Sequence, residues 1–474
     1  MSLMSQSLLM EAQSLRMEGD LDGSIALLRV VISQCVADEG TNQLTRELWR
    51  MASYQLALLL LQNSGRCYNS TSEREADTIL MKLGYRLRLS TKAFGYPACE
   101  CKSAYDTTKS QLLLIDDILP QSMFDALQHS LRPQSRYWSD FYSKAHESDD
   151  EDGRRRIFAS HNVSLPSSTE LTYTKCIEKA SSLIEQVAII VKHCLLQHFP
   201  SISTANSAEI WSHRRAPDAQ HQLHYDCDEL SLHSHRNKLR HKADVNATKR
   251  GNKRQKVENN SGEKSINNQT EDWTKDLCPI VSCVLTVNVP NEATNCDRCG
   301  RLGDGAPTLV CNQSLSGGRS NEGWLCYPQK NRLTAFDGSL LHAVVPGIPS
   351  ETLNEDDNGS RVTFMIGFWK EVTLTVPDET SQCLTIGPNV PFPSSLLDEF
   401  KPIQVDECTL LEHVSKATDH KKDPNHVKPL WVEIKSEDAG KSDNLGTIGE
   451  HNFSGRFFLR STDPNEIDNE VLGL

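Results

Sequence analysis

The sequence predicts an α+β protein, with helices in the first part of the chain and a sandwich or barrel of short strands after them. Two observations support this fold class. Up to about residue 97, apolar residues recur three or four positions apart, which is the spacing of a helix with one buried face. From about residue 208 onward, short runs rich in β-branched residues alternate with turn residues. That pattern favours a sandwich or barrel over a doubly wound sheet.

Three apolar segments make up the predicted helical region of residues 1–97. They cover residues 11–35, 46–62 and 73–90, and Pro97 ends the run because proline cannot continue a helix. Small residues recur where two helices would approach closely, which resembles the helix pairs of tetratricopeptide repeats with a period of about 34 residues. An unrelated helical domain explains the same pattern, so both interpretations stay open.

A second folded region is expected over residues 105–378. It begins with an apolar strand, a turn and a helix at 111–131, followed by a long amphipathic helix at 172–199. The predicted strands come next, at residues 208–215, 222–229, 279–289, 307–312, 332–338, 340–347 and 361–370.

Two polar segments interrupt or follow these strands. Residues 236–275 contain almost no apolar side chains, so they cannot bury enough surface to offset the entropy of ordering, and we expect them to be disordered. Residues 379–474 are also mostly polar, and we expect a weakly ordered tail. The segments 430–434 and 456–460 are strand-like islands that could add an edge strand.

Composition places the chain in a reducing compartment and away from membranes. It shows no secretory signal and no run of the roughly 20 apolar residues that a membrane span needs. Its 15 cysteines lack the spacing of a disulfide scaffold. The net charge of −13 argues against a surface built to grip nucleic acid. The basic cluster at 249–256 resembles a nuclear localisation signal, so we expect a cytoplasmic or nuclear protein that is not secreted.

A metal site is predicted around His224, Tyr225 and Asp226. Residues two apart on a strand point to the same face, so one imidazole and one carboxylate would converge on one ion. His342, on a distant strand, would complete a set of two histidines and one carboxylate, which leaves coordination positions open as non-haem Fe(II) oxygenases require. A triplet of this kind also arises by chance among 16 histidines, and His213 and His221 are rival ligands.

Arg361 is the second candidate for chemistry. It lies near the start of an apolar strand, and Thr363 lies two residues later on the same face. A guanidinium deep in a barrel is costly unless it meets a carboxylate with two parallel hydrogen bonds. The alternative interpretation of Arg361 is an ordinary cation at the edge of a strand.

The order of these motifs resembles the 2-oxoglutarate/Fe(II)-dependent dioxygenases, and most closely their prolyl-4-hydroxylase-like branch. The resemblance covers roughly residues 105–236 and 276–375. It rests on five ordered elements, namely His224 with Asp226, the strand 281–289, Gly305 to Thr308, Phe336 to Gly338 with His342, and Gly359 with Arg361 and Thr363. It implies a double-stranded β-helix (jelly-roll) oxygenase core with supporting helices. Long insertions stretch two intervals between strands, where they cost little.

The resemblance also implies roles for these residues. His224, Asp226 and His342 would bind Fe(II) and act as the catalytic residues, and Arg361 and Thr363 would hold 2-oxoglutarate. Oxygen would be the second co-substrate, and ascorbate would be a further cofactor. The reaction would hydroxylate a C–H bond and release succinate and carbon dioxide.

A protein substrate hydroxylated on a prolyl residue is the first expectation for the target. Oxidative demethylation of nucleic acid or of a methylated protein is a second one, which the basic insert favours and the net acidity disfavours. A non-catalytic interaction scaffold with an oxygenase-like fold is the third, although a decayed site usually loses a ligand.

Two further groups of residues have competing interpretations. Cys296 and Cys299 form one close pair that could bind zinc, but a structural zinc site usually has two such pairs, so reduced loop cysteines are the alternative. Pocket-lining aromatic residues cannot be identified from spacing, and the candidates are Tyr137, Trp138, Tyr142 and Trp211.

Overall fold

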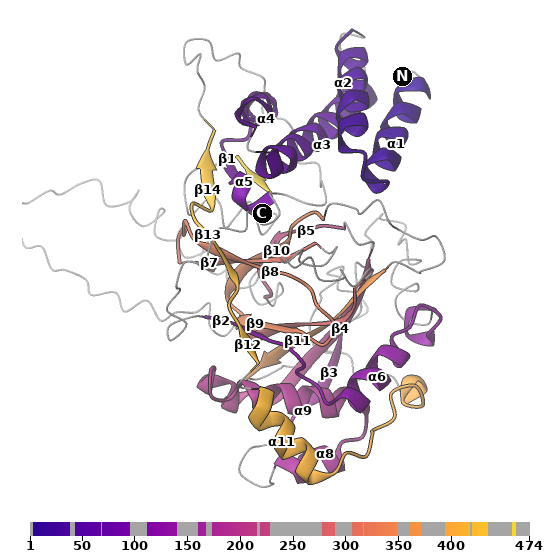
Figure 1. Cartoon of the computed structure of the whole chain (residues 1–474), viewed down its shortest axis with the longest axis vertical. Helices are drawn as coiled ribbons and strands as arrows, with labels where there is room; N and C mark the ends of the chain where they lie inside the picture. Colours follow the sequence, from indigo (N-terminus) through magenta and orange to yellow (C-terminus); the bar gives the residue numbers. More distant parts are fainter. Residues whose placement is uncertain are drawn as a thin grey trace, which may run out of the picture.

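The computed structural model contains helices together with antiparallel sheets, as the predicted α+β class requires (Figure 1). It describes residues 3–37, 43–67, 69–94, 111–139, 160–166, 173–215, 219–227, 277–289, 306–315, 317–347, 360–370, 394–417, 420–434 and 457–460. The basic insert at 236–275, Cys296, Cys299 and Tyr142 lie outside these residues.

The larger of two facing sheets has seven strands in the order β12-β2-β9-β6-β11-β4-β3, with antiparallel pairing throughout. Its strands are β2 (Leu112–Ile115), β3 (His161–Ser164), β4 (Ser207–Arg215), β6 (Val281–Asn288), β9 (Leu333–Asp337), β11 (Arg361–Trp369) and β12 (Lys421–Lys422).

The smaller sheet has five strands in the order β13-β8-β7-β10-β5, also antiparallel. Its strands are β5 (His221–His224), β7 (Thr308–Ser314), β8 (Gly323–Cys326), β10 (Leu340–Val344) and β13 (Asn425–Val427). Side chains from both sheets, including Val284 and Phe336 from one and Val310 and Trp324 from the other, form a shared buried cluster. The two sheets therefore face each other across a common interior.

Helices cover the outer face of the larger sheet (Figure 1). They are α6 (Gln121–Ser130), α8 (Tyr173–Lys179), α9 (Leu183–Leu195) and α11 (Glu407–Ala417), with the short 3-10 helices η3 (Pro200–Thr204) and η4 (Ser394–Leu396). Alternate residues of β6 separate the two environments. Val281, Cys283 and Leu285 pack against the helices, whereas Ser282 and Val284 face the smaller sheet. This two-residue period is what a strand covered on both faces produces.

The N-terminal helices pack on the outer side of the smaller sheet (Figure 1). They are α1 (Leu3–Met17), α2 (Leu21–Ala37), α3 (Gln43–Cys67), α4 (Ser70–Lys82) and α5 (Thr91–Phe94). Their apolar faces share one buried cluster with Leu309, Leu325 and Leu341 of that sheet. Gln62 of α3 also donates a buried hydrogen bond of 3.0 Å from Nε2 to the Pro346 carbonyl. The tetratricopeptide assignment and the domain limits at 97, 105 and 378 stay predictions.

Two of the expected helices end earlier than the sequence predicts. The predicted helix 73–90 stops at Lys82, where Gly84 has a positive φ of 87°, and residues 87–89 form a strand instead. The predicted helix 172–199 is two helices, because Ser182 caps a new one by accepting a hydrogen bond of 3.2 Å from the backbone N–H of Glu185.

The described part of residues 379–474 contributes strands to all three sheets. The two expected islands form β14 (Trp431–Glu433) and β15 (Phe458–Leu459), which flank β1 (Leu87–Leu89) in a three-stranded sheet. The helix α11 was not expected in this mostly polar region. The strands β12 and β13 were not expected either, because strands of two or three residues are too short to show a period. Among the described helices, none combines the length and apolar character needed to cross a membrane.

Candidate metal centre

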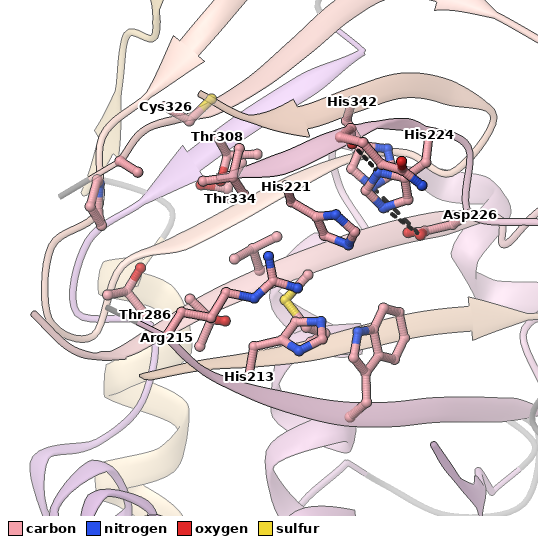
Figure 2. Close-up of a pocket in the computed structure, with 18 of the residues that line it drawn as sticks. His213, Arg215, His221, His224, Asp226, Thr286, Thr308, Cys326, Thr334 and His342 are labelled. Carbon is pink, nitrogen blue, oxygen red and sulfur yellow. Dashed lines mark hydrogen bonds and ion pairs between the residues drawn. The ribbon is translucent and has the colours of Figure 1, made fainter. Parts of the chain in front are cut away.

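Two neighbouring strands of the smaller sheet bring the predicted ligands together. Strands β5 and β10 pair so that His224 lies directly opposite His342, and the centroids of the two rings are 4.2 Å apart. The prediction placed His224 and Asp226 on one strand. Strand β5 ends at His224, so Asp226 lies two residues beyond it. The carboxylate nevertheless lies beside both rings (Figure 2).

The three side chains offer one ligand atom each within 4.8 Å of one another. Asp226 Oδ1 lies 3.7 Å from His224 Nε2 and 3.5 Å from His342 Nε2. The side chain of His342 is 4% exposed and that of Asp226 is 12% exposed, whereas His224 is 26% exposed. These three residues line one cavity, and His224 is the most exposed of them.

Backbone carbonyls orient both imidazoles. His224 Nδ1 is 2.8 Å from the carbonyl oxygen of Gln222, and His342 Nδ1 is 3.0 Å from that of Leu340. A carbonyl only accepts, so each Nδ1 carries the proton as a donor and each Nε2 keeps a free lone pair. Both lone pairs face Asp226, as ligands to one cation require.

Ser282 holds the carboxylate from the opposite sheet. Its hydroxyl, on β6, donates a hydrogen bond of 2.7 Å to Asp226 Oδ2, which leaves Oδ1 directed at the two histidines. Ser282 is 2% exposed. This contact between the two sheets was not predicted from the sequence, because a serine inside an otherwise apolar strand gives no signal of its partner.

The protonation states of the three groups are coupled. Burial alone would raise the pKa of Asp226, but the charge and hydrogen bond of His342, the charge of His224 and the Ser282 hydroxyl together lower it well below its usual range. Burial, followed by the charge of His342, lowers the pKa of His224 to about 4. Burial disfavours the charged form of His342 too, but Asp226 outweighs it and raises the pKa of that imidazole. The raised pKa of His342 and the lowered pKa of Asp226 thus have one cause, the attraction between this imidazole and this carboxylate.

Two arginines from paired strands line the same cavity. Arg361 opens β11 and is 5% exposed, and it lies opposite Arg215 of β4 in the strand register. Arg361 Nη1 donates to the Ala306 carbonyl, and Arg215 Nη1 donates to the Gln220 carbonyl at 3.1 Å. Arg361 is therefore a buried cavity residue and not a cation at an exposed strand edge. Thr363, the predicted companion of Arg361, also lines the cavity, opposite His213.

The rival histidines lie in the cavity but outside the triad. The ring of His221 stacks on that of His224, with the ring centroids 4.4 Å apart. The ring centroid of His213 lies 6.1 Å from that of His221. All three histidines are labelled in Figure 2. Burial lowers the pKa of both well below the usual value, so both are neutral. Neither belongs to the group of three ligand atoms that the described residues form.

Among the predicted pocket aromatics, Trp211 lines the cavity. Tyr137 and Trp138 instead pack among the helices of the outer layer. The Tyr137 ring lies 6.0 Å from that of Phe400, and Trp138 Nε1 donates to the Leu131 carbonyl at 3.1 Å. Their sequence neighbourhood is aromatic, but it belongs to a helical turn that faces away from the cavity.

No family model matches this chain, and no curated protein matches it either. Among solved structures, a prolyl-4-hydroxylase from Pseudomonas putida is 12% identical with a TM-score of 0.28, covering 56% of this chain and 92% of its own. HygX from Streptomyces hygroscopicus, with nickel and 2-oxoglutarate bound, is 9% identical with a TM-score of 0.24, covering 58% of this chain and 88% of its own. Similarities of this size are too low to establish a shared fold or activity, so the proposals below rest on the geometry of the site.

Proposed function

We propose that this protein is an Fe(II)- and 2-oxoglutarate-dependent dioxygenase that hydroxylates a C–H bond. One observation carries the proposal. Two imidazole nitrogens and one carboxylate oxygen converge in a cavity that also holds the buried guanidinium of Arg361. A metal site and a carboxylate site thus share one enclosed space.

The three ligands fit a divalent transition metal. Two neutral Nε2 atoms and an ionised carboxylate form a two-histidine, one-carboxylate set, which is typical of non-haem Fe(II) oxygenases because it leaves positions open for a co-substrate and oxygen. A structural zinc site would instead supply four protein ligands. When bound, Fe(II) would supply the oxidative chemistry that couples decarboxylation of 2-oxoglutarate to hydroxylation.

The protein's own residues position the reactants. Arg361 would bind the far carboxylate of 2-oxoglutarate through parallel N–H···O hydrogen bonds, and the Thr363 hydroxyl would add another. Fixing both ends of this co-substrate orients it before the substrate reacts. Val284 and Met365 also line the cavity, and their side chains make this part of its wall apolar.

The strand order supports a double-stranded β-helix core. From β4 to β11 the chain alternates between the two sheets, and only β7 and β8 are successive strands of the same sheet. This alternation is how a jelly roll places two antiparallel sheets face to face. His224 and His342 lie on the smaller sheet and Ser282, which contacts Asp226, lies on the larger one, so the proposed metal site lies between the two sheets.

A prolyl residue of a protein remains the first proposal for the target, on the strength of the motif resemblance described above. The use of ascorbate and a cytoplasmic or nuclear location also remain predictions. The intact triad beside a buried arginine argues against the scaffold alternative.

The test is release of succinate from 2-oxoglutarate by purified, Fe(II)-loaded protein. We expect turnover by the wild type and none above background for His342→Ala, because the metal loses a ligand that is 4% exposed. His420→Ala is the matched control, since this histidine is 46% exposed and lies on the far edge of the larger sheet, next to β12. Equal turnover by the wild type and His342→Ala would refute the proposal.

A further inference from the structure

The cavity has two ends of opposite charge along one strand. Alternate residues of β4, namely Glu209, Trp211, His213 and Arg215, line it. Arg215 lies opposite Arg361 at the cationic end. Glu209 lies six residues away, or about 20 Å along an extended strand, and is 5% exposed. The proposed function uses the cationic end and leaves Glu209 without a role.

Glu209 and Ser282 lie at the same position along the strands of the larger sheet. Glu209 pairs with Gly367 of β11, and Gly367 in turn pairs with Ser282 of β6, whose hydroxyl holds Asp226. Register partners of antiparallel strands point to the same face. Glu209 is therefore two interstrand spacings, or about 10 Å, from the serine that supports the metal ligand.

Two indoles flank this carboxylate. Trp369 Nε1 donates a hydrogen bond of 3.1 Å to Glu209 Oε2, and Trp211 lies two residues from Glu209 on the same face of β4. Gly367 makes room for the first indole, since a Cβ atom there would lie 3.1 Å from Trp369 Nε1. A carboxylate beside aromatic rings is an arrangement that binds organic cations through charge and cation–π attraction.

A second acceptor lies beside Glu209 in the sheet. Asn162 of β3 pairs with Glu209 in the register, so both side chains are on the same face of the sheet. Its Oδ1 atom is buried and has no hydrogen-bond partner among the residues that the structure describes. A buried acceptor is costly unless a donor reaches it. Glu209 lines the cavity and Asn162 is its neighbour outside that lining, so the ammonium or guanidinium group is assigned to Glu209.

We infer that Glu209 binds a protonated amine or guanidinium of the substrate, so that the enzyme hydroxylates a carbon close to a positive charge. This inference rests on the proposed dioxygenase function and favours a cationic substrate over a prolyl residue. With 2-oxoglutarate at Arg361, the substrate's cationic group would occupy the opposite end of the cavity, level with the metal centre. A lysyl or arginyl side chain, or a free amine, has this chemistry. A neutral prolyl peptide offers Glu209 no charge.

The first test compares blocked pentapeptides, Ala-Ala-X-Ala-Ala, in the succinate-release assay with Fe(II)-loaded full-length protein. X is lysine or its neutral match norleucine, arginine or its neutral match citrulline, or proline, and free L-lysine is added as a separate substrate. We expect at least a tenfold preference for the charged member of a pair, the size of effect that a buried charge-assisted hydrogen bond produces. Equal rates within both pairs, or a preference for proline, would overturn the inference.

Variants separate charge recognition from a structural role. Glu209→Gln keeps an acceptor for Trp369 Nε1 but removes the charge, so the charged-to-neutral ratio should fall to near one. Glu412→Gln, on the exposed face of α11, is the matched control and should keep the ratio. Trp369→Phe removes the indole donor. If Glu209 only holds this indole, Glu209→Gln will keep the charged-to-neutral ratio of the wild type and Trp369→Phe will slow charged and neutral peptides alike, which contradicts the inference.

A binding measurement remains informative if no peptide is oxidised. Intrinsic tryptophan fluorescence is titrated with n-butylammonium chloride and, as the neutral probe, n-butanol. The wild type should give a saturable response to the cation alone, weakened at least tenfold in Glu209→Gln. A cation response that is absent or unchanged in Glu209→Gln sinks the inference. Lack of succinate from any substrate, with a normal cation response, instead counts against the proposed function.

Discussion

Removal of the Ser282 hydroxyl should weaken the metal centre without touching a ligand. In Ser282→Ala, Asp226 Oδ2 loses a 2.7 Å hydrogen bond from a donor that is 2% exposed. A hydrogen bond to a charged group contributes about 1.5–3 kcal/mol, and 1.36 kcal/mol corresponds to a factor of ten. We therefore expect the metal dissociation constant to rise by about 10–100-fold, within the range found for residues that orient metal ligands.

The assay is anaerobic titration with Fe(II) against a competing chelator. Ser212→Ala is the matched control, because Ser212 is also 2% exposed, lies on β4, and its hydroxyl has no hydrogen-bond partner within the described part of the chain. The control should bind metal like the wild type. A change of less than twofold in Ser282→Ala, or an equal loss in the control, would refute this account of how Asp226 is held.

Three further predictions follow from the same geometry. Arg361→Gln should raise the KM for 2-oxoglutarate by about 30-fold or more, since losing one partner of a buried charge pair costs at least about 2 kcal/mol; an unchanged KM in succinate-release kinetics would contradict this. Metal affinity should rise about tenfold per pH unit and level off above the pKa of His342, because a metal competes with the proton of this imidazole. Asp226 raises the pKa of His342, so the rise should extend above the usual range of a histidine. A metal affinity that does not change between pH 6 and 8, measured by chelator competition, would contradict this coupling between His342 and Asp226. Gly338→Ala should destabilise the fold by about 1–3 kcal/mol or more, since its Cβ would lie 2.1 Å from the Pro279 carbonyl oxygen; an unchanged thermal melting temperature would show that the turn can adjust.

The strands that carry His342 and Arg361 could be predicted because their residues follow strand periodicity. His342 follows the Asp337-Gly338 turn and lies on β10, and Arg361 opens β11, both as predicted. These residues precede or follow recognisable turns, so their strands can be located without knowing which strands pair.

Features that depend on pairing between distant segments could not be predicted. The hydrogen-bonded residues Ser282 and Asp226 are 56 positions apart in the sequence, and Glu209 and Trp369 are 160 positions apart. Nothing local marks either contact, because serine and glutamate are common in strands and only the register shows that they face the cavity. The same holds for β1, whose partners Trp431 and Phe458 lie more than 300 positions away.

The predicted end of the helix at residues 172–199 was wrong for a different reason. Apolar periodicity continues through residues 172–199, but Ser181 and Ser182 interrupt the backbone pattern, and the hydroxyl of Ser182 begins a new helix. Periodicity describes which face is buried, whereas a cap decides where a helix starts. Reading the two signals together would have placed the break.

Equilibrium binding of metal and co-substrate tests the central claim most directly. Anaerobic dialysis should show one Fe(II) per wild-type chain and one 2-oxoglutarate retained only when the metal is present. His224→Ala, Asp226→Ala and His342→Ala should each lose the ion, and with it the 2-oxoglutarate. Retention of one Fe(II) by all three variants, or metal-independent binding of 2-oxoglutarate, would contradict the claim that these three residues and Arg361 form one catalytic centre.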